Sequence, residues 1–186
     1  MSMRIALVAV AMVTAAPLSA HSELEEGFAG ALRGCEEWVL NPASWAEGLD
    51  PFVSAVGLGD KMGLVETVNA AALPPREMRA ANHYWRINST ADAGYILVVS
   101  DQLPMCHITG GGGSDLQPVV QAVLASNDFQ LRWEKVKDNS TGEMLTTEYR
   151  SREEPAFSVF ISRAKEPGQR LDRVQVLATA TYEIGN

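Results

Sequence analysis

The sequence predicts an α+β domain in which amphipathic helices pack on one face of an antiparallel sheet of about six strands. Two patterns favour this class. Apolar residues recur at helical spacing near residues 24–39 and again after residue 115, and the second half of the chain holds short alternating runs separated by turn residues. The length of 186 residues, 46% of them hydrophobic, suits one domain, which we expect to span residues 21–186.

The first 20 residues have the layout of a secretory signal peptide. Arg4 precedes an apolar run at residues 5–16, and the segment that follows ends in the small residue Ala20. A charged start and a short apolar centre engage the export machinery before cleavage, and the run is too short to cross a bilayer comfortably. We expect cleavage after Ala20, with Ala16 as the alternative, and no integral membrane segment in the mature chain.

The mature chain is acidic. The chain as a whole has a net charge of -8, and loss of Arg4 with the leader leaves 14 basic against 23 acidic residues, a net charge of -9. Such a surface repels phosphate backbones and anionic lipid heads. Nucleic acid is therefore not expected as a partner.

The chain has two cysteines, Cys35 and Cys106, which also indicate the compartment. In an exported chain an even number of cysteines most simply predicts one disulfide. A reactive thiol pair usually has its cysteines close in sequence, and these two lie far apart. We expect a periplasmic or secreted protein with a structural Cys35–Cys106 bridge.

A helix is the first element predicted in the mature chain. Ser22 and Glu25 form a capping box, in which each side chain bonds the backbone N–H of the other residue. The segment then carries apolar residues at helical spacing, at Leu24, Phe28, Leu32, Cys35 and Val39. We expect one amphipathic helix that ends before Asn41 and places Cys35 on its apolar face.

Shorter elements are predicted between residues 43 and 81. A turn of helix is broken by Gly48, and a second helix follows with Asp50 as its cap, Pro51 in its first position and an end at Gly57. Residues 61–73 suit a short strand or an irregular cover. The two prolines that come next allow a brief helix through residue 81.

Three strands and a helix are predicted in the centre of the chain. Residues 83–87, 95–99 and 105–109 form the strands, and the apolar run at 95–99 indicates a strand covered on both faces. Four glycines then connect to a helix that Asp115 caps, because Pro118 falls in its first turn, where no internal bond is required. The apolar face of this helix consists of Leu116, Val119, Val120, Val123 and Leu124.

The last third of the chain predicts a four-stranded antiparallel meander. Apolar and polar residues alternate at 129–133, 145–149, 157–161 and 174–180, and turn residues separate these runs at 138–142, 151–155 and 166–168.

The order of these features resembles that of small exported proteins of Gram-negative bacteria with no assigned activity. The features are a leader, a helix with one cysteine, the stretch LVVSDQLPMCHITGGGG, an amphipathic helix and a meander. The resemblance spans most of the mature chain and implies a periplasmic location. It carries over no functional residue.

The glycine run is the first candidate site. Consecutive glycines before a helix can let backbone N–H groups hold an anion, so we take Gly110, Gly111, Gly112 and Gly113 as candidate ligand-binding residues. A nucleotide loop is not expected, because no lysine follows, the Walker spacing is absent and Asp115 is negative. A flexible connection from strand to helix is the favoured interpretation of the run.

His107 and Asp115 form the candidate catalytic pair. They are the one place where an imidazole, a carboxylate and the hydroxyls of Thr109 or Ser114 come close in sequence. No GxSxG turn supports a hydrolase, and no pair of histidines or cysteines has the spacing of metal ligands. We expect no metal and no cofactor.

Three functions stay open at this point. The favoured one is a non-enzymatic module that binds a protein, peptide or small-molecule ligand through the sheet face or the glycine run, because folding signals account for nearly every residue. The second is a small hydrolase using His107 with Asp115 or a nearby hydroxyl. The third is a thiol-disulfide role for Cys35 and Cys106.

Overall fold

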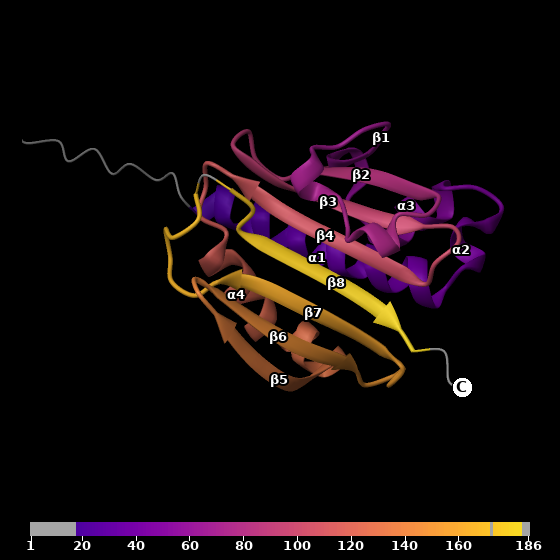
Figure 1. Ribbon diagram of the computed structural model, residues 1–186. Coiled ribbons are helices and arrows are strands. Elements are labelled where there is room, and N and C mark those ends of the chain that lie inside the picture. The colour runs from indigo at the N-terminus through magenta and orange to yellow at the C-terminus, as the bar shows by residue number, and fades with distance from the viewer. Residues whose placement is uncertain (1–17, 172, 184–186) are drawn as a thin grey trace, which may run out of the picture.

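The computed structural model describes residues 18–171 and 173–183, and these residues form one antiparallel sheet with helices packed on one face (Figure 1). The expected α+β class is confirmed. The sheet has eight strands, however, and not about six. Most of the expected leader lies outside the described residues, which begin at Leu18.

The sheet consists of two four-stranded meanders joined side by side. Its strand order is β1-β2-β3-β4-β8-β7-β6-β5, so that β4 of the first meander pairs with β8 of the second. The strands are β1 (Met62–Val65), β2 (Asn82–Asn88), β3 (Ala93–Ser100), β4 (Met105–Gly112), β5 (Trp133–Thr141), β6 (Met144–Ser151), β7 (Phe157–Ala164) and β8 (Val176–Tyr182). The expected C-terminal meander is thus present, as β5 to β8.

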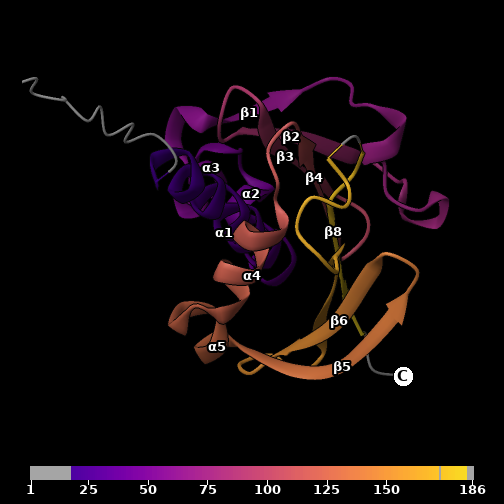
Figure 2. The same ribbon diagram turned by 90° about the vertical axis from the view of Figure 1, so that its left-hand side faces the viewer.

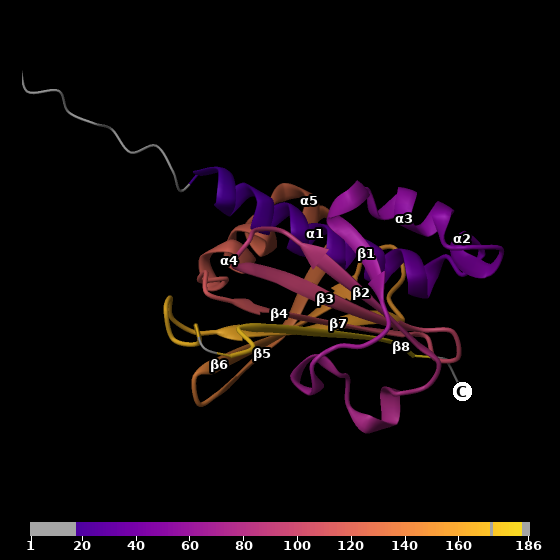
Figure 3. The same ribbon diagram turned by 90° about the horizontal axis from the view of Figure 1, so that it is seen from above.

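The helices precede or connect the two meanders. They are α1 (Leu18–Leu40), α2 (Ala43–Ala46) and α3 (Asp50–Val56) before the first meander, and α4 (Gln117–Ala125) and α5 (Asn127–Arg132) before the second. Seen from the side and from above, α1, α3 and α4 lie on one face of the sheet (Figures 2 and 3). Short 3-10 turns occupy Gly59–Lys61, Ala70–Ala72 and Arg76–Met78.

Helix α1 lies against β3 and β4 and forms the centre of the core. Its inner face is fully buried at Phe28, Leu32 and Trp38. Two hydrogen bonds join it to β3: the Tyr95 hydroxyl donates to the carbonyl of Leu24 at 3.0 Å, and Trp38 Nε1 donates to the carbonyl of Ser100 at 2.9 Å. The apolar stripe expected for this helix is confirmed.

Glycines on α1 permit this close approach. A Cβ built at Gly34 would lie 2.9 Å from a methyl group of Leu97 on β3, and one at Gly30 would lie 2.7 Å from Leu58. Real Cβ atoms do not come so close to other heavy atoms, because the two atoms would overlap in a closely packed interior. Glycine at these two positions thus lets the helix approach β3 and Leu58 without displacing the two leucine side chains.

The disulfide predicted from the two cysteines is present. Cys35 of α1 and Cys106 of β4 are joined, with their Cα atoms 5.5 Å apart and a separation of 71 positions in sequence. Both residues are buried, with exposed fractions of 2% and 0%. The bond ties the inner face of α1 to the middle of the sheet.

The opposite face of the sheet, which we call the second face, carries the side chains of Arg86, Ile96 and Thr109. Part of it lies beneath residues 66–81, the cover segment, which runs on the side of the sheet away from α1 and α3 (Figure 3). The Ser100 hydroxyl on this face donates to the carbonyl of Ala80 in the cover segment. Val98 beneath it is fully buried, so the central strand β3 is covered on both faces, as expected.

Two predicted elements differ from the structure near residue 130. Residues 127–132 form helix α5 and not a strand, because the Ser126 hydroxyl accepts the N–H of Phe129 as an N-cap. Phe129 and Trp133, one helical turn apart, are both buried, whereas Leu131 is 76% exposed. The strand β5 (Trp133–Thr141) then continues through residues 138–141, where a turn was expected, and pairs only with β6.

The predicted helix caps are also corrected. Helix α1 already includes Leu18, so Ser22 lies inside it and is not the N-cap of an expected capping box. Helix α3 begins at Asp50, whose side chain makes no capping bond. Helix α4 begins at Gln117, so that Pro118 is its second residue and Asp115 lies before the N-cap position. Asp115 Oδ1 still accepts the N–H of Gln117 at 3.0 Å, and the apolar face from Leu116 to Leu124 is buried as expected.

Removal of the disulfide tests its structural role. The double substitution Cys35→Ala with Cys106→Ala is expected to lower the free energy of unfolding by about 4 kcal/mol, because a loop of this length gains chain entropy when it is opened. Urea denaturation of both proteins measures the difference. A loss of less than about 1 kcal/mol would contradict a stapling role.

Candidate functional site

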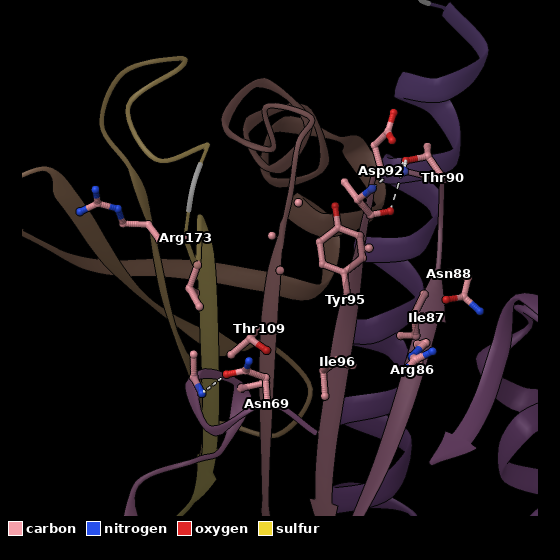
Figure 4. A pocket seen from close by; sticks show the side chains of 18 of the residues that line it. Asn69, Arg86, Ile87, Asn88, Thr90, Asp92, Tyr95, Ile96, Thr109 and Arg173 are labelled. Atoms are coloured by element: carbon pink, nitrogen blue, oxygen red, sulfur yellow. Dashed lines mark hydrogen bonds between the residues drawn. The ribbon is translucent and has the colours of Figure 1, made fainter. Parts of the chain in front are cut away.

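An open groove of about 720 Å³ lies on the second face of the sheet. The cover segment forms one wall through Asn69, and the segment before β8 forms another through Leu171 and Arg173. Its floor consists of the ends of β2, β3 and β4 (Figure 4). It is larger than a second hollow, of about 270 Å³, which lies beside α1.

Strand register places the floor residues in two rows. In the outer row Asn88 of β2 pairs with Gly94 of β3, which pairs with Gly111 of β4. In the inner row Arg86 pairs with Ile96, which pairs with Thr109. Facing residues on neighbouring strands have Cβ atoms about 5 Å apart, so each row crosses the groove in a line.

The outer row leaves the backbone of the sheet uncovered by side chains. Glycine inside a strand weakens the strand and often marks a place where another backbone or a ligand approaches closely. At Gly111 a Cβ would lie 3.1 Å from the carbonyl oxygen of Arg173, and at Gly94 it would lie 2.5 Å from that of Ile87. The paired glycines thus let the chain before β8 lie against the sheet and keep the floor flat.

The structure places three of the four candidate glycines in a strand, and not in a flexible connection. Gly110, Gly111 and Gly112 belong to β4 and pair with β3, and all three line the groove. Gly110 lies where a Cβ would meet the rings and methyls of Tyr95 and Val176 at 2.6 Å. Gly112 has φ of +136°, which favours glycine, and Gly113 donates its N–H to the carbonyl of Asp92 at 2.8 Å.

Four side chains in the groove present hydrogen-bond donors that have no acceptor. Arg86, Asn88 and the Thr109 hydroxyl make no side-chain hydrogen bond within the part of the chain that the structure describes. Asn69 Oδ1 accepts the N–H of Ala71 at 2.9 Å, so its amide group must direct its N–H atoms elsewhere. In Figure 4, Asn69 lies beside Thr109 on one side of Ile96, and Arg86 lies on the other.

Three charged residues line the groove, Arg86, Arg173 and Asp92. The side chain of Arg173 points away from the floor, whereas Arg86 lies beside Ile96 (Figure 4). The chain as a whole has 15 basic and 23 acidic residues. An exposed guanidinium in an otherwise acidic protein raises the concentration of small anions in its neighbourhood.

His107 and Asp115 are not brought together. His107 Nδ1 lies 2.9 Å from Thr179 Oγ1 on β8, and Nε2 is buried without a partner in the described part of the chain. Asp115 accepts the N–H groups of Gln117 and Gly168, at 3.0 Å and 2.7 Å. His107 is 2% exposed and does not line the groove, so a substrate in the groove has no path to its imidazole.

Burial also determines the charge of His107. It lowers the pKa of the imidazole to about 4, because the charged form loses its hydration and no carboxylate compensates. The residue is therefore neutral at physiological pH. A general base needs a pKa near the working pH and a route to substrate, and His107 has neither.

A second hollow, of about 270 Å³, lies where α1 approaches α5. Glu36 and Arg132 form an ion pair there, and Arg132 also donates to Asp128 at 2.8 Å. Burial raises the pKa of Glu36 to about 7, because lost hydration outweighs the attraction of the Arg132 guanidinium. Since these groups already bind one another, the hollow offers a ligand fewer open donors than the groove does.

Comparisons with known proteins find no match to this chain. No protein-family model matches the chain, and neither a curated protein nor a solved structure matches it. Within residues 18–171 and 173–183 no cluster of three His, Cys, Asp or Glu side chains could hold a metal ion. In the same residues no helix is long and apolar enough to cross a membrane.

The sequence alone does not single out the side chains that donate hydrogen bonds in the groove. Arg86 and Asn88 alternate with the buried Trp85 and Ile87, a pattern that predicts an outward position for both polar residues. That signal was present and indicated only a solvated face. No sequence pattern marks Asn69, because it reaches the groove only through the path of the irregular cover segment.

The burial of His107 gives a pH-dependent stability. Its folded pKa of about 4 lies below the usual value of 6.5, so the neutral form is favoured in the folded state. This contribution to the free energy of unfolding is complete above pH 6.5, and about 3 kcal/mol of it has been lost when the pH reaches 4. His107→Asn, which keeps an acceptor or donor near Thr179, should flatten the pH dependence.

Urea denaturation of both proteins at several pH values tests this expectation. The difference in unfolding free energy between the original protein and the variant should shrink or reverse as the pH falls from 6.5 to 4. Using the difference removes the contribution of Glu36, whose raised pKa acts in the opposite direction in both proteins. A difference independent of pH would contradict the burial of a neutral imidazole.

Proposed function

We propose that this chain is an exported, non-enzymatic binding module that holds a small ligand in the groove on the second face of its sheet. The observation that carries the proposal is the set of unpartnered donors at Arg86, Asn69, Asn88 and Thr109 around a floor of paired glycines. Polar groups gathered in a concavity without internal partners are typical of a binding site.

The size of the groove favours a small molecule over a protein partner. Pockets for small ligands usually measure about 300–1,000 Å³, and this groove, at about 720 Å³, falls within that range. A protein interface needs roughly 800 Å² of surface on each partner with an apolar centre. The lining instead mixes guanidinium, amide and hydroxyl groups with a few aliphatic side chains.

Export is supported by two features together. The first 20 residues have the composition of a signal peptide, and the buried Cys35–Cys106 disulfide suits an oxidising compartment. We propose the periplasm as that compartment.

The two other functions have less support from the geometry. A hydrolase would need His107 beside Asp115 in a cleft, and the two residues have different partners. A thiol-disulfide role would need an accessible sulfur, and both cysteines are buried.

Filling the groove tests the binding function. Ala71 is an exposed residue of the cover segment that lines the groove, so Ala71→Trp should occupy the space without disturbing the core. A fragment screen followed by amide chemical shifts is expected to give ligands that move the signals of Gly94 and Gly111, and Ala71→Trp should abolish these shifts.

Ala46→Trp, at an exposed position of α2 outside the groove, is the matched control and should bind as the original protein does. Fragments that bind elsewhere, or that bind Ala71→Trp equally well, would contradict the proposed site.

Export predicts a shortened protein. When the full chain is produced in a Gram-negative host, the mass of the purified protein should correspond to a start at His21, or at Pro17 if cleavage follows Ala16. Thiol titration under denaturing, non-reducing conditions should find no free thiol. Recovery of an uncleaved, reduced chain from the cytoplasm would contradict export.

A further inference from the structure

We infer that the ligand of the groove is a small organic carboxylate with a short apolar chain, and that Arg86 binds its carboxylate. This inference rests on the proposed function and names the class of ligand. It follows from the balance of donors and acceptors in the groove, from the charge of Arg86, and from the position of the aliphatic residues.

The groove has more donors than acceptors. Arg86 carries only donors, and the amide N–H groups of Asn69 and Asn88 and the Thr109 hydroxyl add to them. The Thr90 hydroxyl, by contrast, is already bonded to the backbone of Asp92 and Ala93. A site with surplus donors binds most strongly a ligand with surplus acceptors, and an anionic oxygen pair is the strongest acceptor in small metabolites.

The inner row favours one anionic group close to Arg86. Arg86 is exposed, makes no ion pair within the described residues, and lies directly beside Ile96 in the register. A guanidinium can bind both oxygens of a carboxylate in parallel. Asp92 at the rim and the acidic surface of the chain disfavour a ligand with two negative charges.

The aliphatic residues of the groove offer contacts to the apolar part of the ligand. Ile96 lies at the centre of the floor, and Leu171, which is 44% exposed, lines the opposite wall. A chain of a few methylene groups that leaves Arg86 can lie across Ile96, which is its neighbour in the register, and Leu171 adds apolar surface elsewhere in the lining. Each methylene removed from water there contributes about 0.8 kcal/mol before the costs of binding, which is enough to favour hexanoate over acetate.

The experiment compares probes that differ only in the head group. Hexanoate, hexanamide and hexyl phosphate are titrated into the disulfide-bonded protein while the amide signals of Gly94 and Gly111 are followed. Hexanoate is expected to bind with a Kd of about 1 mM, a usual value for so small a ligand, and hexanamide about tenfold more weakly. Hexyl phosphate should bind no better than hexanoate.

Three variants identify the group that recognises the carboxylate. Arg86→Gln should weaken hexanoate binding about tenfold and leave hexanamide unchanged, because only a bond to a charged group is lost. Arg86→Lys should restore part of the loss, since it keeps the charge without the planar fork. Arg150→Gln removes the same charge from an exposed position on the second face outside the groove and should change nothing.

The outcomes separate this inference from the function on which it rests. Hexanamide binding as well as hexanoate, or no effect of Arg86→Gln, would overturn the carboxylate and leave a binding groove in place. Tighter binding of hexyl phosphate would also overturn it, in favour of a phosphate ester. If no probe moves the two signals at about 20 mM, well above the expected Kd, the inference fails, and the Ala71→Trp fragment screen still decides whether the groove binds ligands.

Discussion

The close packing of α1 against β3 and β4 is the constraint on which the rest of this structure depends. Glycine at positions 30 and 34 lets the helix approach its neighbours, and the Cys35–Cys106 bond holds it there. Because the helix occupies this face, the apolar side chains of β3 that point toward it are fully buried, as at Leu97. The side chains that alternate with them must point to the second face, where the groove lies.

The joint between the two meanders explains why the groove forms at the end of β4. Strand β4 pairs with β3 on one side and with β8 on the other, so its glycines belong to a continuous ladder. Gln175, just before β8, secures the joint through its side chain, which accepts the N–H of Leu116 and donates to the carbonyls of Gly112 and Ser114. The run of glycines thus serves two needs, a tight seam between the meanders and an uncovered floor on the second face.

The sequence predicted most of the core and little of the groove, for a physical reason. Burial leaves a periodic signature, so the apolar stripe of α1, the continuous run of β3 and the disulfide could all be inferred. Periodicity failed where two periods coincide: Phe129 and Trp133 suit both alternation and one helical turn, and the cap at Ser126 decides for the helix. It also missed β5, a charged edge strand with only Trp133 buried, because such a strand has no apolar face to detect.

In the sequence, His107 stands out as a candidate for catalysis and Arg86 does not stand out at all. A histidine between a cysteine and a hydroxyl has the composition of a catalytic site, whereas an arginine alternating with apolar residues has the composition of an ordinary solvated face. The fold reverses this ranking, because the cover segment runs over part of the second face and leaves the groove open (Figure 3). His107 is buried on the second face, neutral and inaccessible, whereas Arg86 is exposed on the floor of the groove. Which polar residues can meet a ligand is thus determined by the path of an irregular segment whose sequence carries no periodicity.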